Sequence, residues 1–189
     1  MNITAVVPAA GLARRLGGPN KMLLSFEDST VIGAVVRTLV ACGLPVVVVT
    51  GRDAERVAEA ARPAACVFNA RFAEGLGTSL AAGGAAAPEN DSVLIALGDM
   101  PGLSPEVVRQ LCATHEGPEA ITAAVYSADH DRLAHPIVFG ARYRDELLAL
   151  DGDEGAKRVI ERHRDRLKTV WFEGELRDWD SLPVPPSEA

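Results

Sequence analysis

The stretch from Pro45 to Thr50 contains four consecutive valines, and it constrains the fold more than any other part of the chain. A run that is apolar at every position has no polar face, so it predicts a strand buried on both faces, as in a parallel sheet covered by helices. Residues 3–7 and 92–97 form two further runs of this kind. Parallel neighbours need a crossover between them, so helices are expected in the intervening segments.

Helical spacing is found between these runs. From Thr30 to Cys42 the apolar residues recur at intervals of three and four, and Gly43 follows as a stop signal. Further helices are expected over residues 54–61, 79–87, 105–112, 142–150 and 155–163, and further strands over 65–68, 120–126, 137–139 and 169–172. Asp53 and Ser104 are expected to cap the helices that follow them.

The alternation of strands and helices predicts a three-layer α/β/α, Rossmann-like fold around a mainly parallel, mixed central sheet. We expect one domain over residues 1–182 and a disordered tail over 183–189. In such a sheet, ligands bind beyond the carboxyl ends of the strands. The loops that follow the strands are therefore the candidate site.

Composition and charge narrow the function. The net charge of −7 disfavours a nucleic-acid surface, which usually carries a basic stripe. No apolar stretch approaches the roughly 20 residues needed to cross a bilayer, and no secretory signal precedes the first strand. The cysteines Cys42, Cys66 and Cys112 are expected to be small buried residues of a reducing cytosol, and His115 to be solvated. We expect a cytoplasmic protein that binds neither nucleic acid nor membrane.

The loop after the first strand is suited to an anion. It contains three glycines and the cations Arg15 and Lys21; the glycines are Gly11, Gly17 and Gly18. Glycines let backbone amides approach a ligand closely, and the cations supply the charge that a phosphate chain needs. The spacing matches neither G-x-x-x-x-G-K-[ST] nor G-x-G-x-x-G, so the two commoner phosphate loops are excluded. We predict a site for a nucleoside triphosphate.

The remaining pattern, A-A-G-x-x-x-R-x-G-G-x-x-K over residues 9–21, resembles the signature of the MobA-like NTP transferase family, which includes the molybdopterin guanylyl- and cytidylyltransferases. Five further motifs of that family follow in order. They occupy residues 74–80, 98–101, 135–139, 150–156 and 177–181. The last of them departs from the family's D-I-D-T-P, because Trp179, Ser181 and Leu182 replace three of its residues. The resemblance covers nearly the whole chain.

The resemblance implies a Mg²⁺-dependent enzyme that transfers CMP from CTP to the phosphate of molybdopterin and releases pyrophosphate. Members with Ala-Ala-Gly in the opening loop resemble cytidylyltransferases, and the side chain of Ala10 would narrow the space beside the base. A molybdoenzyme could receive the product. Three alternatives stay open: a transferase that uses GTP or another NTP, one that acts on a sugar or alditol phosphate, and a non-catalytic nucleotide-binding maturation factor.

The resemblance also assigns residues. Arg15 and Lys21 would bind the triphosphate, Asp99 would hold Mg²⁺, and Asp180 (or Asp178) would be the second metal ligand. The nucleotide-binding set is Ala9, Ala10, Gly11, Arg15, Gly17, Gly18, Lys21, Gly75, Thr78, Ser79 and Asp99. Ser79 could equally cap the following helix. The acceptor-binding set is His135, Pro136, Gly152, Asp153 and Gly155.

Overall fold

The computed structural model describes residues 2–11, 20–127 and 133–174. Within these residues a seven-stranded sheet has the order β5-β4-β1-β6-β8-β7-β9. The strands are β1 (Ile3–Pro8), β4 (Val46–Thr50), β5 (Ala65–Phe68), β6 (Ser92–Ile95), β7 (Ile121–Tyr126), β8 (Leu133–Phe139) and β9 (Leu167–Phe172). A small hairpin of β2 (Ser25–Phe26) and β3 (Ser29–Thr30) lies outside this sheet.

The sheet is mixed and mostly parallel, as predicted. β1 pairs in parallel with β4 and β6, β4 with β5, and β7 with β9. β8 runs antiparallel to both of its neighbours, β6 and β7. It begins at Leu133, four residues before the strand expected from the sequence, because Leu133 and Ala134 pair with Val125 and Ala124 beyond an irregularity in the ladder.

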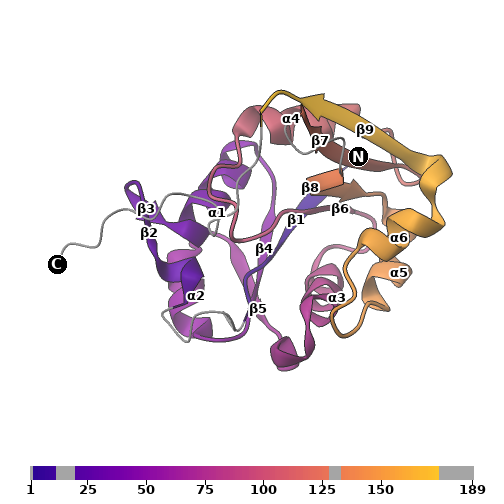
Figure 1. The fold of residues 1–189 in the computed structure, drawn as a ribbon. Coiled ribbons are helices and arrows are strands. Elements are labelled where there is room, and N and C mark those ends of the chain that lie inside the picture. Colours follow the sequence, from indigo (N-terminus) through magenta and orange to yellow (C-terminus); the bar gives the residue numbers. More distant parts are fainter. Residues whose placement is uncertain (1, 12–19, 128–132, 175–189) are drawn as a thin grey trace.

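Helices cover both faces of the sheet (Figure 1). One face packs against α1 (Val31–Ala41), α2 (Ala54–Ala60) and α4 (Pro105–Thr114), and the other against α3 (Leu76–Ala86), α5 (Arg144–Leu148) and α6 (Lys157–Arg162). Short 3₁₀ turns include η1 (Lys21–Leu23), η2 (Phe72–Glu74), η4 (Ala141–Tyr143) and η5 (Arg164–Arg166). The predicted three-layer architecture is confirmed.

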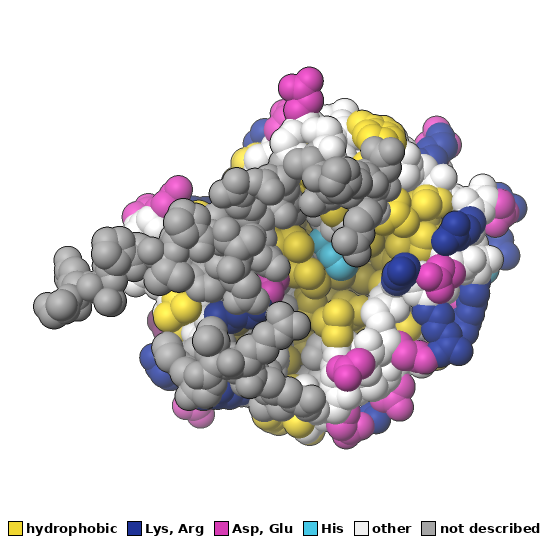
Figure 2. All heavy atoms as spheres, viewed as in Figure 1, with side chains coloured by type: hydrophobic (Ala, Val, Ile, Leu, Met, Phe, Trp, Pro, Cys, Tyr) yellow, Lys and Arg dark blue, Asp and Glu magenta, His cyan; other side chains and the backbone are white. Residues whose placement is uncertain are grey.

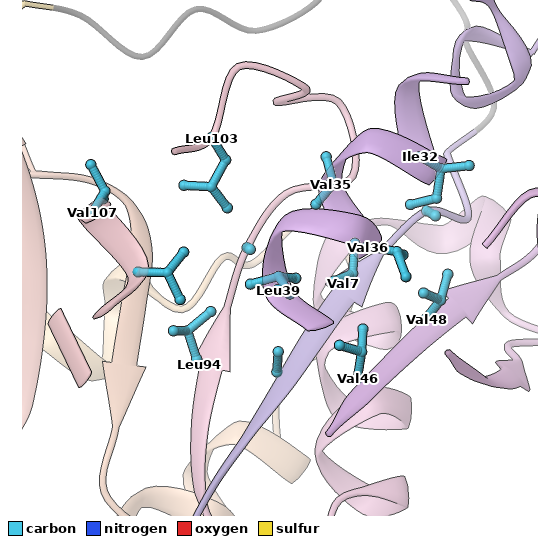
Figure 3. Packing of buried hydrophobic residues seen from close by; sticks show 14 of the residues in the cluster. Val7, Ile32, Val35, Val36, Leu39, Val46, Val48, Leu94, Leu103 and Val107 are labelled. Carbon is cyan, nitrogen blue, oxygen red and sulfur yellow. The ribbon is translucent and has the colours of Figure 1, made fainter. Parts of the chain in front are cut away.

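Alternating side chains of each central strand divide the core into two clusters. Val7 joins the cluster beneath α1, and Val6 joins the one beneath α3. Val48 and Val49 separate in the same way, so the valine run serves both faces. Figure 3 shows Val7, Val46 and Val48 packed under the apolar stripe of α1. α3 lies directly on the sheet, since a Cβ at Gly83 would come within 2.3 Å of Val6 Cγ1.

The helix caps agree with the sequence in one case and differ in another. Ser104 accepts a hydrogen bond from the backbone N–H of Val107, as expected. Asp53 occupies the cap position of α2 in a left-handed conformation, with φ of 56°, and its side chain makes no bond to the helix. Instead it accepts a hydrogen bond from the side-chain amide of Asn20, so tertiary contact replaces the cap.

Three other expectations were wrong. α3 begins at Leu76 with Gly75 at its cap position, so Ser79 lies inside the helix and does not cap it. His115 is buried, because Thr122 and Ser92 satisfy its two ring nitrogens at 3.0 and 3.2 Å. Cys66 is exposed on the edge strand β5.

Candidate active site

The site lies at the carboxyl ends of β1 and β6. The chain crosses from β1 to β4 on one side and later returns to β6 on the other, and ligands of open α/β sheets bind at such a reversal. An open cleft of about 320 Å³ lies there. Figure 2 shows hydrophobic side chains gathered near the middle of one face of the molecule. The cleft is lined by Pro8, Ala10, Gly11, Lys21, Met22, Phe72, Ala73, Gly75, Leu76, Ser79, Leu97, Asp99 and Asp153.

Lys21 and Asp99 meet in this cleft, although 78 positions separate them. Lys21 Nζ lies 2.5 Å from Asp99 Oδ2, and both side chains are mostly buried, with relative exposures of 25% and 19%. The opening loop therefore brings its lysine to the carboxylate at the end of β6. One position thus offers a cation for phosphate and a carboxylate for a metal ion.

Local structure fixes both groups. The side chain of Asn20 accepts a hydrogen bond from Met22 N and caps η1, which starts at Lys21. Asn20 is itself buried and donates to the backbone oxygen of Arg52. On the other side, Gly98 packs so closely that a Cβ would lie 3.0 Å from Pro8 O and 3.1 Å from Met22 Sδ. The chain before Asp99 is thereby held against β1.

One part of the cleft depends on a glycine, Gly51, that the sequence motifs did not reveal. A Cβ at Gly51 would lie 2.6 Å from Phe72 and 2.9 Å from the Cβ of Ala10. Because Gly51 has no side chain, Phe72 and Ala10 can both lie close to it, and both of them line the cleft. In the sequence, the sign of this role was the position of Gly51 directly after the valine strand. Ala9 is buried beside Ala10, and Gly11 is exposed at the cleft.

Asn69 organises the first turns of α3. Its side-chain amide donates to Thr78 Oγ1 at 2.9 Å and to Ser79 Oγ at 3.1 Å, and all three residues are buried. Ser79 lines the cleft, whereas the hydroxyl of Thr78 bonds to the backbone oxygen of Gly75. Sequence reasoning placed Asn69 in a loop and missed this role. An asparagine directly after a strand was the only sign of it.

Of the five residues expected to bind the acceptor, Asp153 alone lines the cleft. The neighbouring oxygen of Gly152 accepts a hydrogen bond from Gly77 N at 2.8 Å. His135 lies half-buried on β8. Burial lowers the pKa of His135 to about 4, against the opposing charge of Asp99. The imidazole is therefore neutral near pH 7. Pro136 follows it in the strand, and Gly155 precedes α6.

Of the two carboxylates expected to bind a metal ion, the structure describes one, that of Asp99. Residues 2–11, 20–127 and 133–174 contain no group of three or more His, Cys, Asp or Glu side chains arranged to hold a metal. Asp99, partly exposed in an open cleft, fits Mg²⁺, which is usually bound by one or two carboxylates together with substrate phosphates and water. Arg15, Gly17, Gly18, Asp178 and Asp180 lie outside the described residues.

Comparison with known proteins identifies the family. The model of the MobA-like NTP transferase domain matches residues 5–167. The chain belongs to this family. It is accordingly a nucleotidyltransferase, as the order of its motifs predicted.

The MobA-like chain has relatives of different names. It is 36% identical over 163 residues to nicotine blue oxidoreductase of Paenarthrobacter nicotinovorans, covering 82% of this chain and 79% of that protein. The structure of Rv0371c from Mycobacterium tuberculosis superposes with a TM-score of 0.81 and 26% identity, over 95% of this chain and 94% of that one. A complex of Rv0371c with manganese gives a TM-score of 0.76 at 25% identity, over 95% of both chains.

A nucleotidyl transferase from Methanothermobacter superposes with a TM-score of 0.76 and 28% identity, covering 90% of this chain and 87% of that one. A divalent metal has thus been seen in one homologue, and a nucleotidyl transferase shares the fold. In the part of this chain that the structure describes, no helix is long and apolar enough to cross a membrane.

Proposed function

We propose that this MobA-like transferase uses Mg²⁺ and CTP to transfer CMP to the phosphate of molybdopterin, with release of pyrophosphate. The observation that carries the proposal is the Lys21–Asp99 pair in the cleft at the carboxyl ends of β1 and β6. Attack of one phosphate on another crowds negative charge, so catalysis requires positioned cations more than a protein base. Lys21 would bind the triphosphate together with Arg15.

Asp99 would hold the metal ion, with Asp180 as the second ligand. The bound ion would polarise phosphate oxygens and neutralise charge that develops during transfer. The neutral imidazole of His135 suits a hydrogen bond to the acceptor better than a charge interaction with its phosphate. Asp153, which lines the cleft, would contact a polar group of the acceptor.

Ala10 supports the choice of a pyrimidine. It is buried, lines the cleft and lies close to Gly51 and Phe72, so its methyl group takes up space at the nucleotide wall. We expect Ala10→Gly to raise activity with GTP relative to CTP. The test is pyrophosphate release with CTP, GTP, UTP and ATP in turn, with molybdopterin and with a sugar phosphate or alditol phosphate as acceptors. Activity confined to GTP would refute the argument from Ala10.

A second candidate is an oxidoreductase activity, favoured by the 36% identity to nicotine blue oxidoreductase. The sequence carries no G-x-G-x-x-G after its first strand, which weighs against a dinucleotide of the ordinary Rossmann type. Melting temperatures with CTP–Mg²⁺, NADH and NADPH separate the two. A ligand at about 100 times its dissociation constant stabilises a fold by roughly 2.7 kcal/mol. Stabilisation by NADH or NADPH alone would favour the second candidate.

A further inference from the structure

Two loops that line the cleft are joined by a close contact. One is the segment 71–77, which carries Gly75 and Leu76, and the other is 151–154, which carries Asp153. Gly77 N donates to Gly152 O at 2.8 Å. Arg71 Nη2 bridges the loops from outside, 2.5 Å from Glu74 Oε2 and 2.7 Å from Asp151 Oδ1. We call this contact the clasp.

The clasp has no room for side chains. A Cβ at Gly75 would lie 2.2 Å from Gly152 O and 2.5 Å from Asp153 N. A Cβ at Gly77 would lie 2.6 Å from Asp151 O and 2.8 Å from Glu154 O. The obstructing atoms are backbone, so the 151–154 loop would have to move as a unit. The position of Asp153 on the cleft wall is therefore tied to the first turn of α3.

The first turn of α3 is in turn anchored by Asn69, which directly follows β5. Asn69 binds Thr78 and Ser79 through its amide and accepts a hydrogen bond from Arg71 N at 2.9 Å through Oδ1. Asn69 therefore anchors both Arg71, which bridges to Asp151, and the first turn of α3. The two loops are therefore joined by one backbone hydrogen bond and by side-chain contacts of Asn69 and Arg71.

We infer that the clasp couples the two substrate sites: a nucleotide that orders 71–79 also orders 151–154 and fixes Asp153 for the acceptor. Gly77 and Arg71 are then positioning residues, which act on the acceptor through Asp153. The inference rests on the proposed nucleotide site. A nucleotide bound first would then raise the affinity for the acceptor. Because coupling between two ligands is reciprocal, the acceptor would raise the affinity for the nucleotide by the same factor.

The test is amide hydrogen exchange of the full chain with and without CTP–Mg²⁺, followed in peptides covering 71–79 and 151–155. In the wild type we expect CTP–Mg²⁺ to slow exchange in both peptides. In Gly77→Ala, CTP–Mg²⁺ should still slow exchange in 71–79 but should no longer slow it in 151–155. Asp151→Asn, which removes only the outer bridge, should speed exchange in 151–155 about threefold without nucleotide, as expected for loss of an exposed ion pair.

Gly84→Ala is the matched control, since it makes the same substitution in the same helix at a position where the nearest atom is 3.5 Å from the new Cβ. It should behave like the wild type. Protection of 71–79 without protection of 151–155 in the wild type would overturn the coupling while leaving the nucleotide site intact. Equal protection of 151–155 in Gly77→Ala and the wild type would also overturn it. If CTP, GTP, UTP and ATP all fail to protect 71–79, the proposed function fails, and the coupling with it.

Discussion

The pKa of His135 makes a quantitative prediction about stability. Burial lowers this pKa from 6.5 to about 4, so the unfolded chain takes up the proton first as the pH falls. The stability that the neutral imidazole contributes is complete above about pH 6.5 and is lost as the pH falls toward 4. For these two pKa values the loss between about pH 7.5 and about pH 4.5 is roughly 2–3 kcal/mol.

The assay is urea unfolding of the wild type and His135→Gln across this pH range, in the presence of a metal chelator. His115, whose pKa is also lowered by burial, is present in both proteins, so the difference between their curves isolates His135. We expect the wild type to lose about 2–3 kcal/mol more than the variant, whatever the difference in stability between them at neutral pH. Curves that run parallel within about 0.5 kcal/mol would refute a buried neutral imidazole.

Three further predictions concern single contacts. Asp99→Asn keeps the volume of the side chain but removes the negative charge beside Lys21. The rate of nucleotidyl transfer should fall at least about 100-fold while the circular dichroism spectrum stays unchanged, and a normal turnover rate would exclude Asp99 as a metal ligand. Gly83→Ala places a Cβ 2.3 Å from Val6 Cγ1 and should cost about 1–3 kcal/mol in urea unfolding, whereas Gly84→Ala should show no such loss. Tyr143→Phe removes the 2.8 Å hydrogen bond to Glu119 O from a buried ring and should cost about 1 kcal/mol by the same assay; no change would mean that the bond contributes nothing.

The strands were predictable because their signal is local. A valine run without a polar face can satisfy its side chains only between two layers, and the structure buries all five residues of β4. The Ser104 cap is local too, since its hydroxyl reaches an amide three residues away. Such features depend on residues that are close together in the chain, so they can be predicted from the sequence.

The start of α3 was not predictable, and the reason is physical. Gly75 and Gly77 favour a loop by intrinsic propensity, so the helix was expected from Ser79. In the structure these glycines serve close approach, because backbone of the 151–154 loop occupies the space that side chains would need. Tertiary packing therefore decides the conformation here. His115 is a similar case. Its hydrogen-bond partners, Ser92 on β6 and Thr122 on β7, can be identified only once the positions of those strands are known.

By itself, the sequence determined the layers of this protein, its mostly parallel sheet and its family, since periodicity, strand runs and sequence motifs are read directly from the order of the residues. Only the tertiary structure decided that Lys21 meets Asp99, that Gly77 is joined to Gly152, and that His135 lies where burial keeps it neutral. Distance and desolvation depend on which strands become neighbours. Strand order is set by the packing of the whole chain, so no local pattern reports it.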